Sequence, residues 1–130
     1  MIKDIFLIDD DGLVNFLNQE IIKDLYPGKN VRSFESATKA LDCLKEILNS
    51  SDSILPQLIL LDINMPVMDG WEFLDEFEKL PIDIWHDCKV IMHTSSIDPR
   101  DIEKAKKYSS VTDYTTKPLT IQTLTKIFNS

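Results

Sequence analysis

Two unbroken apolar tetrads constrain the fold of this chain more than any other feature. Ile5 to Ile8 and Leu58 to Leu61 contain no polar residue, and an aspartate follows each tetrad directly. Strands have this composition when helices cover both faces of a parallel sheet, because neither face then meets water. A third strand is predicted at Val90 to Met92. Weaker, more polar strands are predicted at Val31 to Phe34 and Val111 to Tyr114, as suits the edges of a sheet.

The segments between these strands have the spacing of amphipathic helices, so each apolar stripe is expected to face the core. In chain order the stripes are Leu13, Phe16, Leu17, Ile21 and Leu25; Ala37, Ala40, Leu41, Leu44, Ile47 and Leu48; Phe73, Leu74, Phe77 and Leu80; Ile102 and Ala105; and Ile121, Leu124, Ile127 and Phe128. Pro27-Gly28 should end the first helix and Pro81 the third. The fourth, from about Pro99 to Tyr108, has a thin apolar face and should be the least firmly docked. The longest connections are expected at residues 49–56 and 81–88.

Five alternations of strand and helix predict an α/β fold, a doubly wound (βα)5 five-stranded parallel sheet. The length of 130 residues fits one domain with a substantial core. We therefore expect a single domain over residues 1–130, with no output domain.

The charge balance and the cysteines narrow the classes of function. A formal net charge of −8 repels phosphate backbones and argues against nucleic-acid binding. Cys43 and Cys88 form no CxxC motif and are expected to be buried thiols in a reducing compartment. The apolar run near the N-terminus is too short for a signal peptide or a membrane span. We expect a cytoplasmic protein without membrane contact.

The unusual polar residues all follow predicted strands. Open α/β sheets bind ligands beyond the carboxyl ends of their strands, so residues at those ends are expected to meet in one shallow pocket. They are Asp9 and Asp10 after the first strand, Asp62 after the third, Thr94 after the fourth and Lys117 after the fifth.

The aspartates in this set predict a site for a hard divalent cation. Oxygen ligands without histidine or cysteine suit Mg²⁺, which keeps several waters and shares itself with phosphate. Asp11 is expected to cap the first helix instead. Taken alone, three consecutive aspartates are more often a solvated turn or a helix cap. The glycine and glutamate spacing of an EF-hand loop is absent.

Four segments, IDDDG, LLDINMPVMDG, HTSS and YTTKP, resemble the receiver domain of two-component response regulators, including the single-domain chemotaxis type. The motifs occur in the family's order, and the resemblance covers essentially the whole chain. It implies a flavodoxin-like sheet with strand order 2-1-3-4-5.

The resemblance also implies a role for each site residue. Asp62 would be the phosphoacceptor, and Asp10, Asp62 and the backbone carbonyl of Asn64 would ligate Mg²⁺, with Asp9 contributing through a water. Thr94 would meet a phosphate oxygen, and Lys117 would pair with the phosphoryl group. Tyr114 would change rotamer on switching, and the Lys117-Pro118 bond would be cis.

The family's partners are a histidine kinase or histidine phosphotransfer protein upstream and a protein target downstream, which the sequence does not identify. The output surface is expected on the fourth helix, fifth strand and fifth helix. One alternative is a pseudo-receiver that binds partners without phosphorylation. Another is a small aspartate- and Mg²⁺-dependent phosphatase of the haloacid dehalogenase kind, although such sites place a second aspartate where this chain has Asn64.

Overall fold

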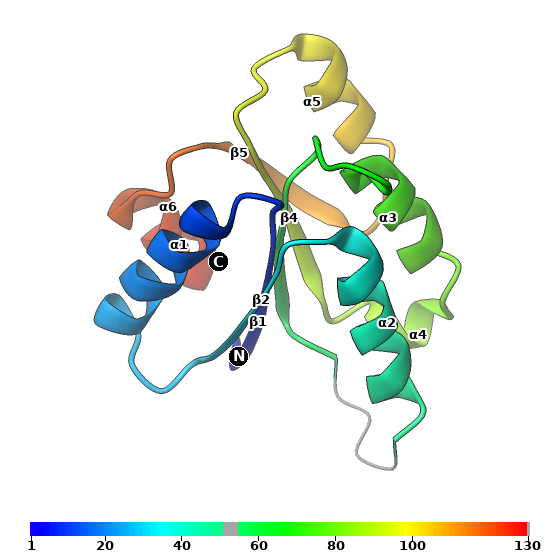
Figure 1. Ribbon diagram of the computed structural model, residues 1–130, viewed down its shortest axis with the longest axis horizontal. Helices are drawn as coiled ribbons and strands as arrows, with labels where there is room; N and C mark the ends of the chain where they lie inside the picture. Colours follow the sequence, from blue (N-terminus) through cyan, green and yellow to red (C-terminus); the bar gives the residue numbers. More distant parts are fainter. Residues whose placement is uncertain (51–54, 130) are drawn as a thin grey trace.

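Five parallel strands form one sheet in the order β2-β1-β3-β4-β5 (Figure 1). This computed structural model describes residues 1–50 and 55–129. The strands are β1 (Asp4–Ile8), β2 (Asn30–Phe34), β3 (Leu58–Leu61), β4 (Lys89–Thr94) and β5 (Val111–Thr116). The predicted doubly wound sheet and its order are confirmed, and the two polar strands β2 and β5 lie at its edges, as expected.

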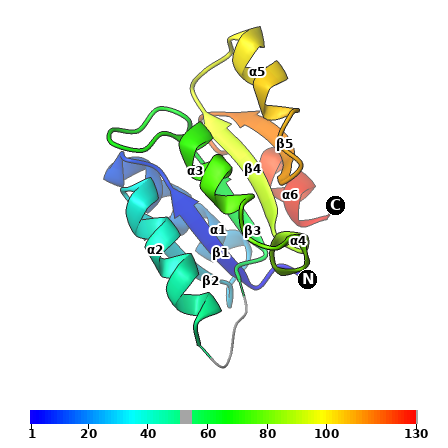
Figure 2. The ribbon, with the colours of Figure 1, turned by 90° about the vertical axis from the view of Figure 1, so that its right-hand side faces the viewer.

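Helices cover both faces of the sheet (Figures 1 and 2). They are α1 (Gly12–Leu25), α2 (Ala37–Leu48), α3 (Gly70–Phe77), α4 (Ile82–Trp85), α5 (Pro99–Ala105) and α6 (Ile121–Phe128). α1 and α6 pack on one face, and α2, α3 and α4 pack on the other. Because α4 was not predicted, the fourth and fifth predicted helices correspond to α5 and α6. Within the described residues, no helix has the length and apolar character needed to cross a membrane.

Two apolar cores follow from the alternation of side chains along the central strands. Phe6 and Ile8 of β1 point to the face covered by α2 and α3, whereas Ile5 and Leu7 point to the face covered by α1 and α6. The tetrad of β3 divides in the same way, and all of its residues are buried. Burial on both faces is therefore the reason why these segments contain no polar residue.

The orientation of α1 contradicts the sequence prediction. Its predicted core stripe is largely in solvent: the exposed fractions are 65% for Leu13, 57% for Phe16 and 54% for Leu17. The buried residues of this helix are instead Asn15, Asn18 and Ile22. The physical reason is that the first turns of α1 pack over the polar carboxyl ends of β1 and β2, where the Asn15 amide satisfies two backbone carbonyls.

Three smaller predictions also need correction. α3 ends at Phe77, so Leu80 lies in the following turn, although it still packs against the core. Ile121, expected in the core, is 55% exposed at the start of α6. The connection at residues 81–88 contains α4, whose Trp85 is buried and donates from Nε1 to the carbonyl of Leu80. Residues 51–54 of the other long connection lie outside the described residues.

Other predictions of burial hold. Cys43 and Cys88 are both free and buried, as expected, and burial raises the pKa of the Cys88 thiol to about 12. Ala105 is the only buried residue of α5, which agrees with the thin apolar face predicted for that helix.

The start of α3 packs tightly against the end of β3. Gly70 donates from its backbone N–H to the carbonyl of Ile63, and a Cβ atom at Gly70 would lie 2.4 Å from the carbonyl oxygen of Asp62. Only a residue without a side chain allows this approach. The contact therefore couples the position of Asp62 to that of α3.

We expect Gly70→Ala to lower the free energy of unfolding by about 2 kcal/mol, since the added methyl group overlaps backbone atoms. Gly12→Ala is the matched control, because its Cβ would meet only the carboxylate end of the flexible Glu35 side chain, at 3.1 Å. The control should change stability by less than about 1 kcal/mol. Urea unfolding measures both, and equal losses would contradict the tight contact at Gly70.

Candidate functional site

Three carboxylates meet at the carboxyl edge of the sheet. Asp9 follows β1 and Asp62 follows β3, and these neighbouring strands pair in register up to Ile8 and Leu61. Carboxylate oxygens of Asp9, Asp10 and Asp62 lie within 4.8 Å of one another. Asp9 and Asp62 are almost fully buried, whereas Asp10 is exposed. Like charges this close raise the free energy of the folded state unless a cation compensates them.

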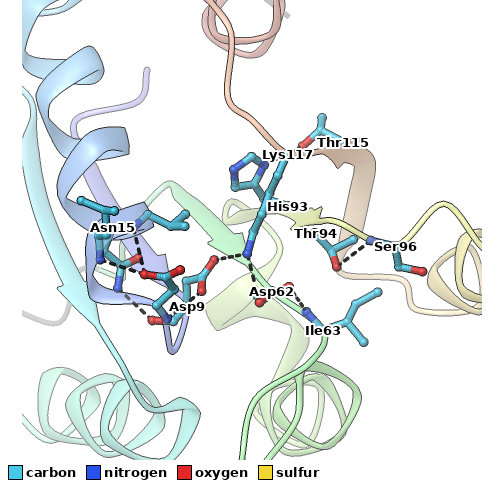
Figure 3. Close-up of polar contacts among 12 residues, drawn as sticks. Asp9, Asn15, Asp62, Ile63, His93, Thr94, Ser96, Thr115 and Lys117 are labelled. Atoms are coloured by element: carbon cyan, nitrogen blue, oxygen red, sulfur yellow. Dashed lines mark hydrogen bonds and ion pairs between the residues drawn. The ribbon is translucent and has the colours of Figure 1, made fainter.

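Lys117 supplies a compensating charge from the far end of the chain. Its Nζ atom lies 2.6 Å from Asp9 Oδ2 and 3.3 Å from Asp62 Oδ2, between the two acids (Figure 3). Burial by itself lowers the pKa of Lys117, but the hydrogen bond to Asp9 and the charges of both acids outweigh this effect. The pKa therefore lies above its ordinary value, and the ammonium stays charged at neutral pH. The Lys117-Pro118 peptide bond is cis, as the resemblance implies.

Hydrogen bonds hold the loop that carries the first acids. Asp11 caps α1 by accepting hydrogen bonds from the backbone N–H groups of Leu13 and Val14, which confirms its predicted separate role. The N–H group of Asp11 in turn donates to Asp9 Oδ1 at 2.9 Å. The third acid of the run thus supports the first without joining the cluster.

The loop after β3 is held at both ends. The N–H group of Ile63 donates to Asp62 Oδ1 at 2.8 Å, which orients the carboxylate of Asp62. At the other end, Asp69 and Glu72 form a capping box at the start of α3. Asn64 lies exposed between these two anchors, and its role as a carbonyl ligand stays a prediction.

Thr94 and Tyr114 are joined to each other through Ser96. Thr94 is fully buried, and its Oγ1 atom accepts a hydrogen bond from the N–H group of Ser96 at 3.3 Å (Figure 3). The hydroxyl of Tyr114 donates to the carbonyl of Ser96 at 2.9 Å. The hydroxyl of Ser96 donates to Asp101 of α5. The predicted switch residues therefore contact the loop before α5, while the acids are held together with Lys117.

Two buried polar residues beside the acids were not singled out from the sequence. Asn15 contacts the loop after β1, and His93 lies behind Lys117 on the α1 side of the sheet. The alternation of strand β4 could have placed His93, because it must face the side opposite to Thr94. No sequence signal marked Asn15, because the apolar stripe of α1 predicted that the other side of this helix would be buried.

The acid cluster of Asp9, Asp10 and Asp62 offers the oxygen ligands that hard divalent cations prefer. All three residues offer carboxylate oxygens, and no cysteine or histidine belongs to the cluster. Asp9 Oδ2 is buried, and Lys117 is its cationic partner within the described part of the chain, so this oxygen already faces positive charge. Such donors suit a hard divalent cation.

Comparison with known proteins gives the family of the chain. A sequence model of the response regulator receiver domain matches residues 5–129. The crystal structure of a two-component response regulator from Cytophaga hutchinsonii is similar with a TM-score of 0.89 and 37% identity, over 98% of this chain and 95% of that one. The chain belongs to the response regulator receiver domain family. Its members are signalling switches of two-component systems rather than enzymes in the usual sense.

Curated relatives carry the same domain within longer proteins. The hybrid signal transduction histidine kinase I of Dictyostelium discoideum is 31% identical over 132 residues, which cover 100% of this chain and 7% of that protein. The probable C4-dicarboxylate response regulator DctR of Halalkalibacterium halodurans is 29% identical over 120 residues, which cover 92% of this chain and 47% of that protein. The chain thus spans less than half the length of either relative.

The stability of the protein should fall in acid because of His93. Burial, followed by the charge of Lys117, lowers the pKa of His93 from 6.5 to about 4, while Asp9 opposes this shift. In the unfolded chain His93 becomes protonated below about pH 6.5, whereas in the folded protein it stays neutral until about pH 4. The free energy of unfolding should therefore fall by about 3 kcal/mol between these pH values.

His93→Gln should lack this contribution, so its stability should depend less steeply on pH than that of the wild type. Urea unfolding of both proteins at pH 7 and pH 4 measures the difference, because the other titrating groups are common to both. Parallel pH profiles would show that His93 takes up its proton as readily in the folded protein as in the unfolded chain.

Proposed function

We propose that this chain is a phosphorylation-dependent signalling switch, a single receiver domain that accepts a phosphoryl group on Asp62. The donor would be a histidine kinase or a histidine phosphotransfer protein. The observation that carries the proposal is the position of Lys117, whose ammonium lies between Asp9 and Asp62 beside Asp10. An expected cytoplasmic location belongs to the same proposal.

Phosphoryl transfer requires mainly positioning and charge neutralisation. An oxygen of Asp62 would attack the phosphorus in line with the bond to the donor's imidazole nitrogen. That bond breaks, its electron pair stays on the nitrogen, and an acyl phosphate forms on Asp62. The nucleophile is already a carboxylate, so no general base is needed. Lys117 would neutralise charge on the transferred group.

Mg²⁺ is the metal that this donor set fits best, since it shares its coordination sphere with phosphate oxygens. Asp10, Asp62 and the carbonyl of Asn64 would hold it directly, and Asp9 would hold it through a water. When bound, the ion supplies positive charge beside the phosphoryl oxygens. The same residues would assist attack of water on the acyl phosphate, which ends the signal.

The output of the switch would run through α5, β5 and α6. An acyl phosphate adds acceptor oxygens close to β4; the Thr94 hydroxyl would donate to one of them and move away from the N–H group of Ser96. Release of Ser96 would free its contacts with Tyr114 and with Asp101 of α5. α5 buries only Ala105, so a change in its position costs few apolar contacts. The α5–β5–α6 surface would then meet the unidentified downstream protein.

The phosphodonor would dock beside α1. A groove of about 360 Å³ lies between this helix and the segment after β5, and apolar Leu17, Ile21 and Pro118 line it together with Lys117. Lys117 also contacts Asp9 and Asp62, so the groove adjoins the proposed site of transfer. Because Asp62 is almost fully buried, its donor must lie close against this rim. The exposed side chains of Leu13 and Phe16 extend the apolar surface.

Acetyl phosphate with Mg²⁺ tests the proposed chemistry directly. The protein should gain the mass of one phosphoryl group, and Asp62→Asn should gain none. Omission of Mg²⁺ should abolish the gain in the wild type as well. Intact-protein mass spectrometry reads all three samples. A wild type that forms no adduct would favour the pseudo-receiver, and turnover of a generic phosphate ester would favour the phosphatase.

Leu17→Ser should slow phosphotransfer from a histidine phosphotransfer protein by about tenfold, since it removes a central apolar contact. Its rate with acetyl phosphate should stay within about twofold, because the small donor needs no docking surface. Ile82→Ser is the matched control, since Ile82 is 66% exposed in α4, on the opposite face. Radiolabelled transfer from a panel of histidine phosphotransfer proteins measures the first rate for both variants, and mass spectrometry measures the rate with acetyl phosphate. Equal slowing with both donors would place the effect of Leu17 in the site itself.

A further inference from the structure

Asn15 is a buried amide on the inner side of α1, with an exposed fraction of 3%. Its Nδ2 group donates to the carbonyl of Asp9 at 2.9 Å and to the carbonyl of Phe34 at 3.3 Å. We propose that Asn15 is a positioning residue for the metal-binding acids: it fixes the backbone that carries Asp9 and Asp10 and thereby sets the affinity for Mg²⁺. This inference rests on the proposed function.

The hydrogen bonds of Asn15 complete a clamp around Asp9. The N–H group of Asp9 donates to the carbonyl of Phe34 at 3.1 Å, at the end of the neighbouring strand β2. Its carbonyl accepts the Asn15 amide, so both peptide groups next to its Cα atom are held. The side chain of Asp9 is held in turn through the N–H group of Asp11. The direction of Asp9 is therefore determined at three points (Figure 3).

The same clamp acts on Asp10. The carbonyl that Asn15 holds belongs to the peptide group joining Asp9 to Asp10, so its orientation sets the direction in which the chain enters Asp10. The Asp10 side chain is exposed, and its placement depends on this backbone more than on packing. Mg²⁺ requires nearly ideal octahedral geometry, so misplaced carboxylates bind it poorly.

Packing alone does not account for an asparagine at this position. The Oδ1 atom of Asn15 is buried and accepts no hydrogen bond from the described residues, which disfavours an amide here. An apolar residue would avoid that penalty and would suit the interior side of a helix better. What the amide adds is the pair of hydrogen bonds from Nδ2. Asn15 therefore holds the loop after β1 through Nδ2, and this gain offsets the cost of burying Oδ1 without a hydrogen bond.

Asn18 provides a matched comparison within the same helix. It lies nearly one turn further along the same buried side and is also an asparagine, with an exposed fraction of 8%. Within the described residues, its side chain makes no hydrogen bond to the carbonyls of Asp9 or Phe34. Asn15→Leu and Asn18→Leu thus remove the same buried amide, but only the first removes the clamp.

Isothermal titration calorimetry with Mg²⁺ alone tests the inference on the whole chain. Asn15→Leu should weaken Mg²⁺ binding by about tenfold, the usual effect of losing a residue that orients metal ligands. Asn18→Leu should stay within about twofold of the wild type. With acetyl phosphate, Asn15→Leu should be slow at limiting Mg²⁺ and should recover at saturating Mg²⁺. A general loss of folding would not produce this recovery.

The outcomes separate a failure of the proposed function from a failure of the role inferred for Asn15. A wild type that binds no Mg²⁺ would overturn the proposed function itself. A wild type that binds Mg²⁺ together with an Asn15→Leu variant of equal affinity would overturn only the role of Asn15. Equal weakening in both leucine variants would also overturn it, since the effect would then belong to the helix in general. If a leucine variant does not fold, the pair Asn15→Ala and Asn18→Ala provides the same comparison.

Discussion

Repulsion among three carboxylates, opposed by one ammonium group, is the interaction on which the carboxyl edge of this sheet depends. Asp9 and Asp62 are buried next to each other with Asp10 beside them, an arrangement that is unfavourable without a cation. Lys117 lies within ion-pair distance of the two buried acids. The loops around them are pinned by caps and backbone hydrogen bonds, so the charges cannot relax by moving apart. Further positive charge at this edge would therefore lower the remaining repulsion.

Most of the fold could be predicted because a strand that is buried on both faces consists of consecutive apolar residues. The apolar tetrads located β1 and β3, and the polar strands were correctly placed at the edges. The orientation of α1 could not be predicted in this way. A stripe of leucine and phenylalanine marks one side of a helix, but it does not say whether that side meets the core or a partner. Phe16 lies in solvent because Asn15 is needed at the strand ends.

The candidate site was predictable to the extent that it depends on topology. Carboxyl ends of parallel strands share one edge, so Asp9, Asp62 and Lys117 were expected at the same edge of the sheet once the strands were assigned. Contacts within that edge depend on side-chain geometry, which spacing does not encode. The hydrogen bond from Ser96 to Thr94 is such a contact. Asn15 belongs to the same class, since its amide acts on a carbonyl six residues earlier.

The order in which the charges occur along the chain has a consequence for biosynthesis. All three aspartates of the cluster have been translated by the time β3 is made, whereas Lys117 comes 55 residues after Asp62. Domains begin to fold from their N-terminal part while the ribosome is still at work. A nascent chain that ends before β5 holds the repelling acids without this counter-ion, so the edge gains its ion pairs only after β5 and Lys117 have been made.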